Sequence, residues 1–458
     1  YCFKSNCWWN KKVFKMNYLE YNNYYFIGIG GIGMSALAEY LISINKVVSG
    51  YDREKSANTD RLLNLGLKIS HKNDLSNLNS QIDKTKTLVI YTPAINNKNI
   101  FFSYFKNTGF NVIKRSDLLA TVVNNKFCIA IAGTHGKTTT TSILSHILYN
   151  SKLKFTSFIG GIINKYDSNI ILNGDDVFIV EADEYDKTFL KLHPNIISIL
   201  NIDGDHYDIY KDYADLLKSF KEFSYNLKKD GVLFHNENLD FNGISFGFKS
   251  KSDLQIMNFV QYEDKSVFDL KVNDKTYKKI EFKMIGIHNA LNALVAFSIA
   301  LKLKIDLSII IKALKSFPGV KRRFSFELYY PKIYIDDYAH HPIEIESVYN
   351  SINSLYPEKK NLVIFQPHLY SRTKDFLNDF AKALEKFDKI ALLDIYPARE
   401  EPINGVSSKS IFDKIKNSNK LLIKKSDLNE LVCNNESELI ISLGAGDIGN
   451  EVELIKKS

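Results

Sequence analysis

The chain has 458 residues and a net charge of +8, with 45% hydrophobic and 24% charged residues. This length exceeds one ordinary domain, and the composition excludes a fibrous or wholly disordered protein. The apolar runs are strand-sized, so we expect no membrane span. The chain has no dense block of basic residues, so we expect no binding to nucleic acid. Four scattered cysteines without a CxxC pair predict a reducing cytoplasmic compartment.

The segment 1–15 has neither a signal-peptide core nor helical periodicity. We expect it to be an upstream translation artefact or a disordered tail, with the natural start at Met16.

The first folded region begins with a strand, "NYYFIGIG", which is followed by a glycine turn and the helix "GMSALAEYLISIN". A second strand, "KVVSGYD", follows, so this region predicts a doubly wound strand–turn–helix–strand unit.

The first glycine turn carries Gly28, Gly30 and Gly33 in the pattern GxGxxG, and Asp52 ends the next strand. Taken alone, this pattern predicts a dinucleotide site for NAD or FAD, with Asp52 at the ribose. Glycines at these positions also serve tight packing of a strand against a helix. The firmer prediction is that the loop can hold a diphosphate.

A second phosphate loop, "GTHGKTT", follows the buried strand "KFCIAIAG" and opens a helix. Backbone N–H groups at a helix N-terminus bind phosphate, Lys137 would reach the β- and γ-phosphates, and Thr138 would bind Mg²⁺. Ile131 stands where the generic motif has its first glycine, so the motif is incomplete. The predicted nucleotide-binding residues here are Gly133, Thr134, His135, Gly136, Lys137, Thr138 and Thr139.

Acidic residues end the next two apolar strands, "DVFIVEAD" and "NIISILNID". Because neighbouring parallel strands end at the same edge of a sheet, Glu181 and His206 could meet the phosphate loop and, with Thr138, hold Mg²⁺ or Mn²⁺. The alternative is that these polar residues only cap the strands.

Polar, alternating segments as far as about residue 283 predict an antiparallel margin, and the helix "HNALNALVAFSIALKL" follows.

The last region, after "FPGVKRRF", alternates strands and helices again. Its stretch "DDYAHHP" has two adjacent histidines, His340 and His341, but adjacent strand residues point to opposite sides and no third zinc ligand is evident. A polar substrate pocket is the favoured interpretation. In "FQPHLYSRT", Arg372 lies four residues after His368 and could bind a carboxylate or phosphate, or could be solvated.

These regions predict an α/β protein of three domains. The first is a Rossmann-like domain at 16–120, the second is a P-loop ATPase-like α/β domain at 121–318, and the third is a further α/β domain at 319–458.

At this point the motifs resemble those of the Mur ligases, the ATP-dependent amide-forming enzymes of peptidoglycan synthesis. The similarity extends from about Tyr24 to Ile448 and is closest to the branch that adds L-alanine to UDP-N-acetylmuramate. The stretches that carry it are "GIGGIGMSALA", "AGTHGKTTT", "EADEYDKTFLKLHP", "NIDGDHYDIY", "GIHNALNALVA", "FPGVKRRF", "DDYAHHP", "FQPHLYSRT" and "LGAGDI".

The resemblance implies one cradle for the UDP of the sugar substrate and another for ATP, with a third, C-terminal Rossmann-like domain that brings the amino acid. It implies an acyl-phosphate intermediate and release of ADP and phosphate. Lys137, Glu181, His206, His340 and Arg372 would be catalytic, and Thr138, Glu181 and His206 would hold Mg²⁺ or Mn²⁺. The implied contacts are His288, Asn289 and Asn292 at adenine; Arg323 and Asp337 at ATP; Gly28, Gly30, Gly31, Ile32, Asp52 and Thr92 at the UDP-sugar; and Tyr338, His340, His368 and Arg372 at the amino acid and acyl phosphate.

One departure from the family pattern is Leu369, where many members have arginine. The alternatives are a ligase that attaches a whole tripeptide to the same UDP-sugar, a folate polyglutamylating ligase, an NAD-dependent dehydrogenase with an ATPase domain, and a non-catalytic nucleotide sensor. The sequence leaves open L-alanine against glycine or L-serine, because one methyl group discriminates by only about 1–3 kcal/mol. It also leaves open whether the protein is a monomer or a homodimer.

Overall fold

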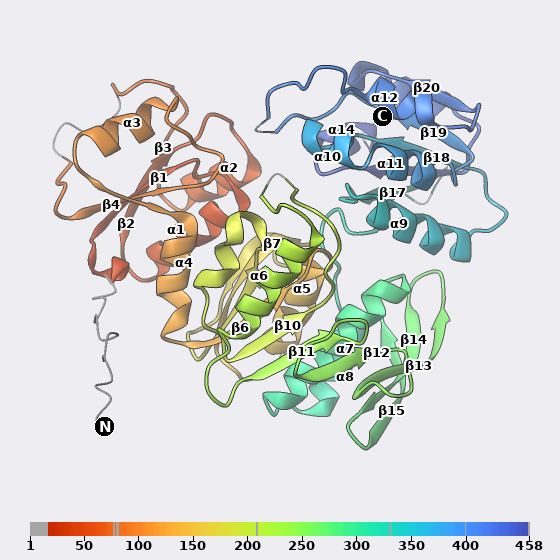
Figure 1. The fold of residues 1–458 in the computed structure, drawn as a ribbon, viewed down its shortest axis with the longest axis horizontal. Coiled ribbons are helices and arrows are strands. Elements are labelled where there is room, and N and C mark those ends of the chain that lie inside the picture. The colour runs from red at the N-terminus through yellow and green to blue at the C-terminus, as the bar shows by residue number, and fades with distance from the viewer. Residues whose placement is uncertain are drawn as a thin grey trace, which may run out of the picture.

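The structure is a computed structural model, and it describes residues 17–76, 78, 82–207, 209–328, 330, 332–398 and 400–456. The segment 1–15 and the expected start at Met16 lie outside these residues. Three separate sheets, each with its own helices, follow one another along the chain (Figure 1). The expected α/β class with three domains is therefore confirmed.

The N-terminal sheet is wholly parallel, with the strand order β3-β2-β1-β4-β5. The strands β2 and β3 lie on one side of β1, and β4 and β5 lie on the other. The carboxyl end of β1 is therefore a topological switch point, and the first glycine turn lies there. The elements are η1 (Tyr18–Glu20), β1 (Asn23–Ile27), α1 (Ile32–Ser43), β2 (Val47–Tyr51), α2 (Ala57–Asn64), β3 (Lys68–Ser70), β4 (Thr87–Tyr91), α3 (Ile100–Asn107), β5 (Asn111–Lys114) and α4 (Arg115–Asn124).

The central sheet has ten strands in the order β15-β14-β13-β12-β11-β10-β6-β9-β7-β8. Its middle is parallel, and antiparallel pairs form both margins. The alternating segments before residue 283 predict the margin of β13, β14 and β15, and the margin of β7 and β8 was not predicted. Its strands are β6 (Phe127–Ala132), β7 (Phe155–Ile163), β8 (Ser168–Leu172), β9 (Val177–Ala182), β10 (Ile196–Ile199), β11 (Val232–Asn236), β12 (Ile244–Gly247), β13 (Leu254–Gln261), β14 (Ser266–Val272) and β15 (Lys275–Phe282). Its helices are α5 (Lys137–Tyr149), η2 (Tyr185–Lys191), α6 (Tyr213–Ser224), α7 (Ile287–Lys302) and α8 (Leu307–Lys315).

The C-terminal sheet has the order β16-β17-β21-β18-β19-β20 and is parallel except for its first pair. Its strands are β16 (Ser325–Leu328), β17 (Ile333–Asp337), β18 (Asn361–Phe365), β19 (Lys389–Leu392), β20 (Lys420–Leu422) and β21 (Leu439–Leu443). Its helices are α9 (Pro342–Leu355), α10 (Tyr370–Asp375), α11 (Leu377–Leu384), α12 (Ser408–Lys414), η3 (Lys425–Asp427), α13 (Leu428–Asn434) and α14 (Ile448–Ile455).

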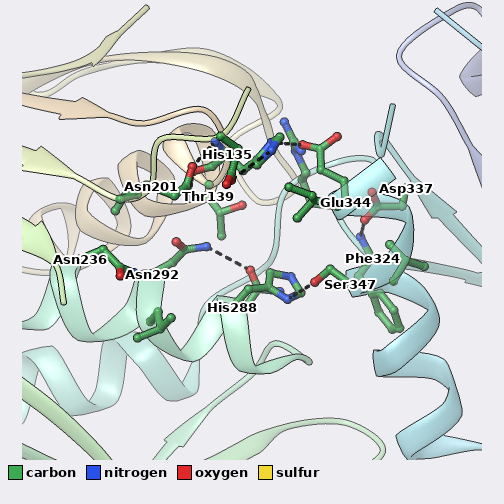
Figure 2. Close-up of a pocket in the computed structure, with 18 of the residues that line it drawn as sticks. His135, Thr139, Asn201, Asn236, His288, Asn292, Phe324, Asp337, Glu344 and Ser347 are labelled. Carbon is green, nitrogen blue, oxygen red and sulfur yellow. Dashed lines mark hydrogen bonds and ion pairs between the residues drawn. The ribbon is translucent and has the colours of Figure 1, made fainter. Parts of the chain in front are cut away.

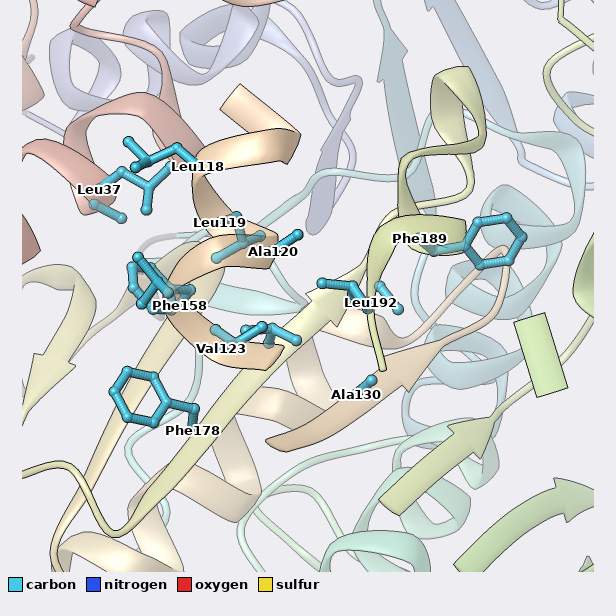
Figure 3. Packing of buried hydrophobic residues seen from close by; sticks show 14 of the residues in the cluster. Leu37, Leu118, Leu119, Ala120, Val123, Ala130, Phe158, Phe178, Phe189 and Leu192 are labelled. Carbon is cyan, nitrogen blue, oxygen red and sulfur yellow. The ribbon is translucent and has the colours of Figure 1, made fainter. Parts of the chain in front are cut away.

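The N-terminal and central domains share one hydrophobic core (Figure 3). Tyr40 of α1 contacts Phe158 of β7 and Phe178 of β9 edge to face, with ring centroids 5.7 and 6.1 Å apart. The C-terminal domain has two further cores, and apart from Ile285 of the central domain their buried residues all come from residues 324–455. We therefore expect the first two domains to behave as one body toward which the third can move. Within the described part of the chain, no helix is both long enough and apolar enough to cross a bilayer.

Candidate active site

The central phosphate loop lies between β6 and α5, and its backbone is held by the end of β10. Gly133 and Gly136 have φ angles of +134° and +84°, which side chains disfavour. Asn201 accepts the backbone N–H of His135 at 2.8 Å and donates to the His135 carbonyl at 3.0 Å. This two-sided clamp fixes the loop at the N-terminus of α5, where backbone amides and the helix dipole favour phosphate.

Lys137, the first residue of α5, is held by an acid that the sequence analysis did not single out. Its ammonium donates to both carboxylate oxygens of Glu184, at 2.9 and 2.7 Å, and to the carbonyl of Gly133 at 2.6 Å. Burial opposes the charge on Lys137, but the Glu184 carboxylate and other acids nearby outweigh it and raise its pKa. Lys137 is therefore a charged group in the cavity where a γ-phosphate is expected.

The predicted metal ligands converge on the same cavity. Thr138 Oγ1 donates to Glu181 Oε2 at 3.0 Å, and His206 Nε2 lies 3.7 Å from Glu184 Oε1. Burial raises the pKa of Glu181, so a cation beside it would stabilise the charged form. The described residues contain no cluster of three or more His, Cys, Asp or Glu side chains arranged for a metal. The candidate set is instead a hydroxyl, a carboxylate and an imidazole, and its oxygen donors suit Mg²⁺.

A cavity of about 430 Å³ joins all three domains at this point. Gly31, Ile32 and Thr92 line it from the N-terminal domain, and Tyr338 and His340 line it from the C-terminal domain. The central domain contributes Thr134, His135, Gly136, Lys137, Thr138, Glu181 and His206. The structure therefore brings together residues that the sequence predicts for three different ligands.

A second cavity, of about 190 Å³, lies between the central and C-terminal domains (Figure 2). The predicted adenine contacts His288, Asn289 and Asn292 line it from α7, and Thr139, Arg323 and Asp337 line it too. Burial lowers the pKa of His288 to about 4, and its Nδ1 lies 2.7 Å from Ser347 Oγ. Burial also raises the pKa of Asp337 to about 6. A cavity whose surface is mostly apolar and carries a few polar and charged groups suits a flat heterocycle.

Glu344 lies where the two cavities meet, and the sequence analysis did not select it although "DDYAHHPIEI" contains it. His135, Gly136, Arg323 and Glu344 line both cavities. Glu344 Oε1 is 3.1 Å from His135 Nδ1 of the phosphate loop, and Oε2 accepts the backbone N–H of His340 at 2.9 Å. Despite burial, the nearby histidines hold the pKa of Glu344 well below its usual range. Glu344 thus links the phosphate loop to the C-terminal domain.

Arg372 is buried and its guanidinium is bound by the protein itself. Its Nη2 lies 3.0 Å from both carboxylate oxygens of Asp205, and its Nε lies 3.2 Å from Oδ1. His368 Nδ1 is 3.4 Å from Arg372 Nη1, and the His368 ring stacks on Tyr396. Arg372 is therefore neither solvated nor an open anion clamp in this arrangement. It is one half of a bridge between the C-terminal and central domains.

In the N-terminal domain, Asp52 supports the first glycine turn. Its Oδ2 accepts the backbone N–H of Gly30 at 2.7 Å, and a Cβ on Gly30 would collide with this carboxylate. Gly28 has a φ of +85° and lies against Thr92. Gly28, Gly30 and Asp52 thus shape the turn, while Gly31, Ile32 and Thr92 face the large cavity.

Three family models match the chain in order: "Mur ligase family, catalytic domain" at 23–127, "Mur ligase middle domain" at 131–300 and "Mur ligase, glutamate ligase domain" at 322–443. A UDP-N-acetylmuramate–L-alanine ligase of Christiangramia forsetii is 46% identical over 97% of this chain and 98% of its own length. One of Flavobacterium psychrophilum is 47% identical over 96% of this chain and 99% of its own length.

Among solved structures, a UDP-N-acetylmuramate–alanine ligase of Thermotoga maritima matches with a TM-score of 0.81 at 28% identity, covering 95% of this chain and 98% of that one. The resemblance that the motifs indicate is thereby confirmed. The chain belongs to the Mur ligase family.

Proposed function

We propose that this protein is an ATP-dependent ligase that joins L-alanine to the lactyl carboxylate of UDP-N-acetylmuramate in peptidoglycan synthesis. The observation that carries the proposal is the large cavity, in which the glycine turn of the N-terminal domain, the phosphate loop and the polar C-terminal residues face one another. The names of the curated relatives support the same substrates.

The reaction has two steps. The substrate carboxylate attacks the γ-phosphorus of ATP, forming an acyl phosphate and ADP, and the amine of L-alanine then attacks the acyl carbon and releases phosphate. Both partners of the first step are anionic, so it needs charge neutralisation more than covalent help. Lys137 supplies positive charge once its ammonium leaves Glu184 for the phosphate. His340 and Arg372 act on the amino-acid side.

Mg²⁺ or Mn²⁺ would be held by Thr138, Glu181 and His206 and would neutralise phosphate charge when bound. The hydrogen bond between Thr138 and Glu181 shows that a hydroxyl and a carboxylate already converge there. Enclosure of the cavity by three domains protects an acyl phosphate from water.

We further propose the binding roles that the resemblance implies. His288, Asn289 and Asn292 contact adenine, Arg323 and Asp337 contact ATP, and Tyr338, His340, His368 and Arg372 surround the amino acid. Gly28, Gly30, Gly31, Ile32, Asp52 and Thr92 serve the UDP-sugar. The domain limits 16–120, 121–318 and 319–458, the cytoplasmic location and the monomeric or homodimeric state belong to the same proposal.

The test is phosphate release from Mg-ATP with UDP-N-acetylmuramate, with and without L-alanine. Release that needs both substrates, stops with EDTA and returns with Mg²⁺ or Mn²⁺ would support the proposal. A tripeptide, glycine or L-serine in place of L-alanine separates the nearest alternatives. Release with the tripeptide but not with L-alanine would overturn the amino-acid assignment, and no release with any acceptor would overturn the ligase assignment.

A further inference from the structure

The C-terminal domain contains a second GxGxxG pattern, Gly444, Gly446 and Gly449, which follows β21 and runs into the first turn of α14. We call residues 444–449 the C-terminal glycine loop. By its spacing after a strand and before a helix, it would predict a further nucleotide site. The function proposed above has no ligand for it.

Two amides of this loop, at its start and at the start of α14, are engaged by the protein. The backbone N–H of Ile448, at the start of α14, donates to Gln366 Oε1 at 3.0 Å, and that of Gly444 donates to the Asp337 carbonyl at 3.2 Å. A Cβ on Gly446 would collide with Gln366 and Tyr396. Packing against the protein therefore explains the glycines of this loop, and a bound phosphate is not needed to explain them.

The side chain that the loop binds is Arg322. Its Nη2 donates to the Gly444 carbonyl at 2.6 Å, and its Nη1 donates to the Gly446 carbonyl at 3.1 Å. Its Nε donates to the buried carboxylate of Asp336 at 2.8 Å. A Cβ on Gly449 would lie 2.5 Å from the guanidinium carbon, so this glycine leaves room for the arginine. The loop thus presents carbonyl groups to a cation instead of amides to an anion.

Arg322 also marks the point where the interdomain linker passes from one domain to the other. Residues 319–321 bond to the central domain: the N–H of Lys321 donates to the Ile162 carbonyl at 2.9 Å, and Val320 pairs with Ile163. Arg322 itself bonds to the C-terminal domain, because its carbonyl accepts the N–H of Tyr338 at 2.7 Å.

Arg323 is the next residue, and it lines both cavities. Its neighbours hold the backbone tightly: Arg322 and Phe324 have φ angles of +60° and +48°, and the N–H of Phe324 donates to Asp337 Oδ2 at 2.6 Å. Backbone in this region persists only where surrounding contacts enforce it. Arg322 supplies such contacts through its bonds to the Asp336 carboxylate and to the carbonyl groups of the glycine loop.

We propose that Arg322 is a positioning residue, whose guanidinium fills the C-terminal glycine loop and fixes the linker so that Arg323 projects into the nucleotide cavity. Arg323 then moves with the C-terminal domain and reaches the nucleotide only when that domain closes. This inference rests on the proposed function in that it assumes a nucleotide in the cavity.

The test uses the full chain and the fluorescent nucleotide mant-ADP with Mg²⁺. Arg322→Ala should weaken binding about tenfold to a hundredfold, as loss of one charge-assisted hydrogen bond to the ligand would. Gly449→Ala should weaken mant-ADP binding similarly although it removes no charge, because the new Cβ would displace the Arg322 guanidinium. Alanine has a higher helix propensity than glycine, so the substitution should not destabilise α14 itself. Lys321→Ala and Asn450→Ala, at exposed neighbouring positions, are the matched controls and should bind as wild type does.

A double-mutant cycle separates positioning from general stability. If Arg322 acts through Arg323, then Arg322→Ala should have almost no further effect in an Arg323→Ala background. Equal weakening in both backgrounds, or wild-type binding by both Arg322→Ala and Gly449→Ala, would overturn the inference. Wild-type protein that binds mant-ADP but forms no amide would refute the proposed function alone, and wild-type protein without mant-ADP binding would refute both.

Discussion

Replacing Arg372 by methionine tests the bridge between the C-terminal and central domains. The substitution keeps much of the side-chain volume but leaves the Asp205 carboxylate buried without its cation. Both side chains are less than a tenth exposed, and two of their N–O distances are 3.0 Å. Removing one partner of such a buried pair costs about 3–5 kcal/mol.

This energy opposes closure and leaves each domain's own stability largely unchanged, because Arg372 belongs to α10 and Asp205 lies in the segment between β10 and α6. If the reaction needs the closed arrangement, kcat/KM should fall by about two to four powers of ten. Small-angle scattering should show a larger radius of gyration for Arg372→Met, while the unfolding of the separate C-terminal core should be little changed.

The matched variants are Asp205→Asn and the double mutant. Asparagine keeps an oxygen for the backbone N–H of His206, which Asp205 Oδ1 accepts at 2.8 Å. In the double mutant no charge is left buried, so kcat/KM should recover part of what Arg372→Met loses. If Arg372 acts only by contacting the amino acid, the role that the family resemblance implies, and the bridge to Asp205 adds nothing, Asp205→Asn should rescue nothing. A double mutant that is as inactive as Arg372→Met, or more so, with an unchanged radius of gyration would refute the bridge.

Three further predictions concern the phosphate loop, a buried histidine and the shared core. Lys137→Met should lower the rate of phosphate release by about 10²–10³ or more, because it removes the charge that meets the γ-phosphate. It should also lower the free energy of unfolding, because it leaves the buried Glu184 carboxylate without its cation, so the rate is compared on folded protein; a rate near wild type would contradict the role. Burial lowers the pKa of His146 from 6.5 to about 4, so its contribution to stability is complete above pH 6.5 and is lost as the pH falls toward 4. Between pH 7 and pH 5, the free energy of unfolding measured in urea should therefore fall by about 2 kcal/mol more for wild type than for His146→Gln. Phe158→Ala should lower the free energy of unfolding by about 3–5 kcal/mol. In calorimetry, one unfolding transition shared by the N-terminal and central domains should move to lower temperature while the C-terminal transition stays in place. Separate transitions for the N-terminal and central domains would contradict a shared core.

The fold was predictable because its signals are local. Short apolar runs, each followed by a glycine turn or an acidic end, predict parallel sheets, and β6, β9 and β10 lie at those runs. The alternating residues before 283 likewise become the antiparallel strands β13, β14 and β15. Strand order and the shared core were not predictable, since they depend on contacts between segments far apart in the sequence.

The candidate site was predictable where a motif carries its own chemistry, as in the phosphate loop. Glu184, Asp205 and Glu344 were missed because their function depends on a partner from another element. The sequence shows several acids near Glu184 but not which one Lys137 reaches. It places Glu344 in the first turn of a helix without showing that His135 of another domain lies 3.1 Å away. Arg372 illustrates the same limit, because its partner lies 167 positions earlier in the chain.

The three glycine loops show why a phosphate-loop pattern alone does not identify a ligand. Each follows a parallel strand and opens a helix, so each offers the same backbone geometry. In the first loop Asp52 takes the N–H of Gly30 and leaves Gly31 and Ile32 at the large cavity. In the second, Asn201 fixes the backbone and Lys137 adds a positive charge. In the third, Gln366 takes the helix amide and the loop carbonyls bind Arg322. The side chains around a loop decide whether its amides or its carbonyls are available, and they thereby decide whether it binds an anionic ligand or a cation of its own chain.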